Sequence, residues 1–123
     1  ESAFVGVTVT TNRSVMFGSL SGDQLGIWVA HGEGKFSLPY AEDKYNVVLK
    51  YSYDEYPANP NGSDYSVAGI CSPDGRHLAM MPHLERAIFP WQNAWYPADR
   101  RQDEVTPWIE AFVNARKWIE EQK

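Results

Sequence analysis

Strand-like segments outnumber helical ones so strongly in this chain that it can build only a sheet with little helical cover. Apolar or β-branched runs predict strands at residues 4–9, 25–30, 47–53, 67–71 and 77–81. The turn sequence at residues 72–75 joins the last two and predicts a hairpin. One clear helix starts near Thr106 and Pro107 and is expected to end at about Glu120. We therefore expect an α/β fold whose sheet is incompletely covered, which indicates that residues 1–123 are part of a larger domain.

Two apolar patterns refine this expectation. The run at residues 25–30 is almost continuously apolar, which is typical of a strand buried on both faces in a parallel or mixed sheet. The helix carries an apolar stripe that must pack against another part of the protein. The stripe consists of Trp108, Phe112, Ala115 and Ile119.

Composition excludes several classes of partner. The net charge is −5, and the longest basic run is Arg100-Arg101, so neither nucleic acid nor a membrane is an expected partner. A single cysteine, Cys71, rules out an internal disulfide framework and is consistent with a reducing compartment. No apolar run approaches the length of a membrane span, so we expect a cytoplasmic location.

His83 and Glu85 are the strongest candidates for catalytic side chains. They follow the probable strand at 77–81, and loops at strand ends often carry catalytic groups. Side chains two residues apart on an extended backbone point the same way, so the carboxylate can orient the imidazole ring. Such a pair is the base and orienter of a triad that still needs a nucleophile.

Three motifs occur in an order that resembles a known family. They are Val29-Ala30-His31-Gly32-Glu33-Gly34, residues 56–63 with the sequence YPANPNGS, and Asp74-Gly75-Arg76 followed by residues 80–86 with the sequence MMPHLER. The chain is similar to the C-terminal part of the glutaminase domain of the phosphoribosylformylglycinamidine synthase family. This domain is a class I glutamine amidotransferase with a flavodoxin-like fold. The resemblance implies a mixed sheet with a hairpin and one long C-terminal helix.

The resemblance also implies a chemistry. In this family a cysteine attacks the side-chain amide of glutamine, and the ammonia released serves ATP- and Mg²⁺-dependent synthesis in the purine pathway. His83 and Glu85 match the family's catalytic histidine and acid, although Leu84 stands where proline is common. The family's nucleophile lies in a Gly-x-Cys-x-Gly elbow, upstream of the segment matched here. Cys71 runs into a hairpin turn without a following helix, so we expect it to be structural and this chain alone to be inactive.

The remaining polar motif residues have less specific interpretations. A place near the substrate or between domains is implied only by the resemblance, and turn chemistry alone also accounts for the motifs. These residues are His31, Glu33, Asn59, Asn61, Ser63 and Arg86. The aromatic residues Phe89, Trp91, Trp95 and Tyr96 are expected to pack against the terminal helix rather than to stack on bases.

Two alternatives to the glutaminase remain open at this level. The two His-x-Glu pairs could bind a divalent metal ion, although the chain is expected to hold no cofactor of its own. The chain could instead be a non-catalytic interaction module, since an unpaired sheet edge and an uncovered apolar face favour homo-oligomers. On the family interpretation its partners are glutamine, the upstream half of the glutaminase domain and the synthetase domain.

Overall fold

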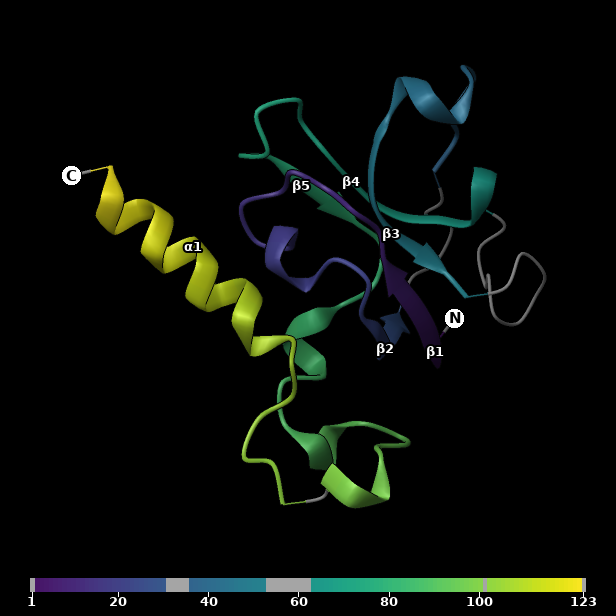
Figure 1. The fold of residues 1–123 in the computed structure, drawn as a ribbon. Helices are drawn as coiled ribbons and strands as arrows, with labels where there is room; N and C mark the ends of the chain where they lie inside the picture. The colour runs from purple at the N-terminus through teal and green to yellow at the C-terminus, as the bar shows by residue number, and fades with distance from the viewer. Residues whose placement is uncertain (1, 31–35, 53–62, 101, 123) are drawn as a thin grey trace.

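A computed structural model describes residues 2–30, 36–52, 63–100 and 102–122 of the chain. Five strands form one sheet in the order β2-β1-β3-β4-β5 (Figure 1). Their bounds are Ser2–Val9 for β1, Gln24–Ala30 for β2, Asn46–Tyr51 for β3, Val67–Cys71 for β4 and Leu78–Met80 for β5. All five predicted strands are therefore confirmed, as is the hairpin of β4 and β5.

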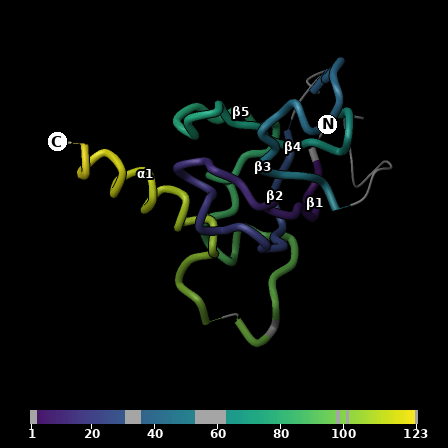
Figure 2. The backbone as a smooth tube through the Cα atoms, turned by 45° about the horizontal axis from the view of Figure 1, so that its top comes forward, coloured from purple at the N-terminus to yellow at the C-terminus, as the bar shows by residue number. Residues whose placement is uncertain are grey.

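Every pairing between these strands is antiparallel, so the parallel pairing expected for β2 is not found among the described residues. The apolar character of β2 has another cause. Ile27 and Val29 lie in the core on one face, while Trp28 on the other face is half-buried against Phe4. The outer edge of β2 is also covered, because His83 forms an antiparallel bridge with Trp28. The chain that follows β5 thus reaches back to β2, and the sheet curls (Figure 2).

The core lies inside this curl. Val7, Val9 and Val48 are fully buried, and each comes from one of the central strands. Leu84 and Ala87, from the segment after β5, belong to the same cluster. Burial of large apolar side chains is the main favourable term in folding, so this cluster holds the segment that contains His83 and Glu85 against the sheet.

The predicted helix is confirmed as α1, which spans Ile109–Glu121 and projects to one side of the sheet (Figure 1). Its contact face matches the predicted stripe only in part, because Trp108 is buried in the core at 1% exposure whereas Phe112 and Ile119 are 41% and 53% exposed. Ala111 is buried instead, and the Asn114 amide donates to the Met16 carbonyl at 3.0 Å. Small and polar side chains permit this close approach, and the helix is therefore rotated relative to the prediction.

The prediction that the aromatic side chains after His83 pack on α1 is wrong. Trp91 and Trp95 are 79% and 72% exposed, and residues 89–100 lie apart from the helix (Figure 1). Phe89 and Trp91 stack on each other instead, with ring centroids 5.6 Å apart and planes inclined by 5°. The turn is closed locally, because the Phe89 N–H donates to the Gln92 side-chain oxygen at 2.9 Å.

Candidate active site

The structure brings His83 and Glu85 together. His83 Nδ1 lies 3.1 Å from Glu85 Oε2, and the two side chains are 36% and 57% exposed. A carboxylate bound at Nδ1 favours the tautomer in which Nδ1 carries the hydrogen and Nε2 can accept a proton. The pair can therefore act as a base with its orienting acid, and both groups are open to solvent and to a substrate.

The backbone that carries the pair is a tight turn rather than the extended strand assumed from the sequence. His83 itself is extended, with φ −116° and ψ 93°, but Leu84–Arg86 form one 3-10 turn. Leu84 is 6% exposed and points into the core, so its neighbours face outward. Leu84 therefore lies on the opposite side of the backbone from His83 and Glu85, as expected, but a 3-10 turn and not an extended strand produces this arrangement.

Both ends of this turn are anchored to distant parts of the chain. The His83 N–H donates to the Trp28 carbonyl of β2 at 2.9 Å. At the other end, the buried Thr106 hydroxyl donates to the Ala87 carbonyl at 2.7 Å, and the Thr106 N–H donates to the Ile88 carbonyl at 2.6 Å. Sequence reasoning placed Thr106 at the start of the helix but missed these bonds, because they join residues 18 or more positions apart.

Strand topology shows where the two strands that precede the other motifs end. Ala30 ends β2 opposite Ser2, and the Ser52 N–H donates to the Gly6 carbonyl at 3.0 Å, so β2 and β3 both end toward the start of β1. The His83–Trp28 bridge lies near that same end of β2. The topology therefore places the His83 turn and the ends of β2 and β3 at one end of the sheet.

Of the six remaining predicted residues, the structure describes Ser63 and Arg86. His31, Glu33, Asn59 and Asn61 lie outside the described residues. Ser63 is buried, and its hydroxyl oxygen accepts the Phe36 N–H at 3.0 Å, which supports the structural interpretation of this serine. Arg86 is exposed, and no carboxylate of the described residues lies within ion-pair distance of it.

Cys71 is buried at the end of β4 and belongs to the core, as expected for a structural residue. Burial raises the pKa of its thiol, and this outweighs the opposing effect of the Arg13 charge. The hairpin register places Cys71 opposite Leu78. The extended chain from Leu78 to Met81 then spans about 10 Å, and it carries the backbone away from Cys71 before His83 is reached. Cys71 is therefore a poor nucleophile for this site.

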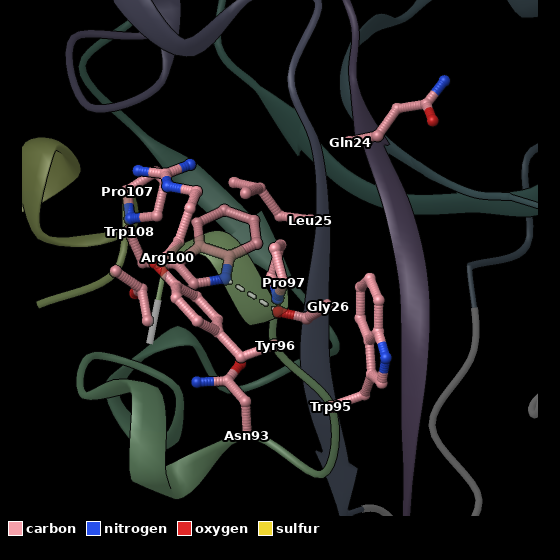
Figure 3. Close-up of a pocket in the computed structure, with 11 residues that line it drawn as sticks. Gln24, Leu25, Gly26, Asn93, Trp95, Tyr96, Pro97, Arg100, Pro107 and Trp108 are labelled. Carbon is pink, nitrogen blue, oxygen red and sulfur yellow. Dashed lines mark hydrogen bonds between the residues drawn. The ribbon is translucent and has the colours of Figure 1, made fainter. Parts of the chain in front are cut away.

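A separate cavity of about 100 Å³ lies between the start of β2 and the segment before α1 (Figure 3). Trp108 lines the cavity and donates its indole N–H to the Gly26 carbonyl at 2.9 Å. The Tyr96 hydroxyl donates to Asp103 at 2.9 Å, and burial together with this carboxylate raises the pKa of Tyr96. Neither His83 nor Glu85 lines the cavity, so it is distinct from the pair.

The described part of the chain lacks two features. No three histidine, cysteine or carboxylate side chains there lie close enough to hold a metal ion. The metal hypothesis also involves His31 and Glu33, so it stays a prediction. Within the same ranges, no helix has the length and apolar character needed to cross a membrane.

Comparison with known families assigns the chain to a class of protein domain. Residues 1–119 match the family model of the CobB/CobQ-like glutamine amidotransferase domain. The chain belongs to this family.

The similar proteins narrow the assignment further. The chain is 41% identical over 139 residues to the probable phosphoribosylformylglycinamidine synthase, chloroplastic/mitochondrial, of Arabidopsis thaliana, and 42% identical over 135 residues to the human phosphoribosylformylglycinamidine synthase. These matches cover 98% and 96% of the chain, and the chain spans 10% of each relative's length. A chain in the structure of PurLQS from Thermotoga maritima has the same fold, with a TM-score of 0.69 and 24% identity over 97% of this chain and 48% of that one.

Proposed function

We propose that this chain supplies the general base and its orienting acid to the glutaminase of a phosphoribosylformylglycinamidine synthase. The observation that carries the proposal is the contact of 3.1 Å between His83 Nδ1 and Glu85 Oε2 on an anchored, accessible turn. Relatives that bear this name match nearly the whole chain at about 40% identity.

The reaction assigns a separate step to each group. His83 takes the proton of a cysteine thiol as the sulfur attacks the amide carbon of glutamine. The imidazolium then gives that proton to the departing nitrogen. The carbon–nitrogen bond breaks, ammonia is released, and the acyl group remains on the cysteine as a thioester. Water, deprotonated by His83, attacks the thioester and releases glutamate with the thiol restored. Glu85 holds the ring in the required tautomer throughout.

The thiol in this proposal comes from outside the chain. Cys71 is buried, its thiol pKa is raised, and it lies along the hairpin away from His83. The chain spans 10% of the length of its named relatives, which leaves ample sequence for a nucleophile, for the upstream half of the glutaminase domain and for a synthetase part. ATP and Mg²⁺ belong to that synthetase part in the proposal.

The test distinguishes the glutaminase reaction from the synthetase reaction that uses its ammonia. In the whole polypeptide, His83→Ala should lower glutamine-dependent formation of formylglycinamidine ribonucleotide by about 10²–10⁴-fold. Activity with added ammonium salt should be unchanged, because free ammonia bypasses the glutaminase. Glu85→Gln should also lower the glutamine-dependent activity selectively, but by a smaller factor than His83→Ala. His77→Ala is the matched control, since His77 is an exposed histidine on the hairpin turn. Full glutamine-dependent activity of the His83→Ala variant would refute the proposal.

A further inference from the structure

Thr106 joins the turn that carries Glu85 to the start of the C-terminal helix. It is 2% exposed and precedes α1 by three residues. Its hydroxyl and its backbone N–H donate to two consecutive carbonyls, those of Ala87 and Ile88, at 2.7 and 2.6 Å. The side-chain oxygen of a threonine at the start of a helix ordinarily accepts a hydrogen bond from one of the helix's own N–H groups, but here α1 has no side-chain cap. The hydroxyl is committed to the Ala87 carbonyl instead.

Ala87 is the residue through which this contact reaches the catalytic pair. Its N–H donates to the Leu84 carbonyl at 3.0 Å and closes the 3-10 turn that contains Glu85. Its carbonyl is otherwise approached only by the Asn93 amide, at 3.4 Å, among the described residues. Ala87 is fully buried, so its carbonyl depends on the Thr106 hydroxyl for a good hydrogen bond.

We propose that Thr106 is a positioning residue for the His83–Glu85 pair, which it holds in register through the Ala87 carbonyl. The backbone bond from His83 to Trp28 fixes the start of the turn, and Thr106 fixes its end. Glu85 lies between these anchors. Loss of the Thr106 hydroxyl leaves only the backbone bond to the Ile88 carbonyl at this end, so the Ala87 carbonyl is released and the carboxylate can move relative to the ring. The kinetic part of this inference rests on the proposed glutaminase function, whereas the clamp itself does not.

The test compares three variants in the whole polypeptide. Thr106→Val replaces the hydroxyl by a methyl group of similar size and should lower kcat for glutamine hydrolysis by about tenfold or more, with KM for glutamine within about twofold. Thr106→Ser keeps the hydroxyl and should restore kcat. Thr10→Val is the matched control, because the Thr10 hydroxyl also donates to a backbone carbonyl, that of Val47, at 2.7 Å in another part of the sheet. It should leave kcat unchanged per folded enzyme.

Hydrogen exchange followed by mass spectrometry gives a readout that does not need activity. The amides of residues 84–88 should exchange faster in Thr106→Val and at the wild-type rate in Thr10→Val. If the valine variant does not fold, Thr106→Ala removes the same hydroxyl with less bulk and is read in the same way. Unchanged kcat with unchanged exchange, an equal loss in Thr10→Val, or failure of serine to restore kcat would each overturn the proposal. A wild-type enzyme without glutaminase activity would defeat the proposed function alone, and the exchange result would still decide the clamp.

Discussion

Leu84→Ala provides the sharpest check on how the candidate site is attached to the fold. Leu84 separates the two proposed catalytic residues, yet it is 6% exposed and packs in the core cluster. Replacing it by alanine removes three buried carbon atoms and leaves a cavity. Substitutions of this kind cost about 2–5 kcal/mol, and the lower half of that range applies because a 3-10 turn can partly collapse.

The expected loss is therefore about 3 kcal/mol in the free energy of unfolding. In a chain of 123 residues this should lower Tm by roughly 10–15 °C. Urea unfolding monitored by tryptophan fluorescence and circular dichroism measures the loss directly, and an unchanged slope m shows that the midpoint reports stability. Leu84→Met nearly preserves volume and should cost less than about 1.5 kcal/mol.

Glu85→Gln is the control that separates the core from the site. Glu85 is adjacent to Leu84, but its side chain is 57% exposed, and surface ion pairs contribute about 0–1 kcal/mol. If Leu84→Ala costs less than about 0.5 kcal/mol, or no more than Glu85→Gln, the turn is not held by burial of Leu84 and the reasoning is refuted.

Two more predictions concern other parts of the chain. Gly75 has φ +75°, and an added Cβ would lie 2.1 Å from the Arg13 carbonyl oxygen, so Gly75→Ala should cost at least about 2 kcal/mol in urea unfolding. Gly22→Ala also has positive φ but meets nothing within 4 Å, and a cost as large as that of Gly75→Ala would contradict the steric argument. For Cys71, burial raises the folded pKa of the thiol, so the unfolded chain ionises first as pH rises through about 8.5 and stability should fall above that pH. Cys71→Ala should remove this part of the slope, and a slope identical to wild type would contradict it.

The local pattern of the sequence was sufficient for much of the fold. Alternation and β-branching located five strands, and the turn at residues 72–75 identified the hairpin, because these signals act over a few neighbouring residues. The same locality made His83 and Glu85 visible as a pair two residues apart. The buried state of Cys71 followed for the same reason, since a cysteine that runs into a hairpin has no helix to expose it.

Errors arose where a segment's partner lies far away in the chain. Of the predicted apolar stripe, Trp108 is buried, but Phe112 and Ile119 are exposed. Asn114 and Ala111 make the helix contact instead, because the surface that receives the helix comes from residues 16–20. Nothing local marks that surface. The aromatic residues after His83 were assigned to the helix for the same reason, whereas Phe89 and Trp91 stack on each other.

The sequence by itself determined the elements, the His83–Glu85 pair and the family resemblance, because each depends on residues close together in the chain. Tertiary structure alone decided how the pair is held. The anchors are the Trp28 carbonyl and the Thr106 hydroxyl, 55 positions before His83 and 19 positions after Ala87. Hydrogen bonds of this kind form only after the sheet curls and the segment before α1 folds back, and buried carbonyls then require those donors.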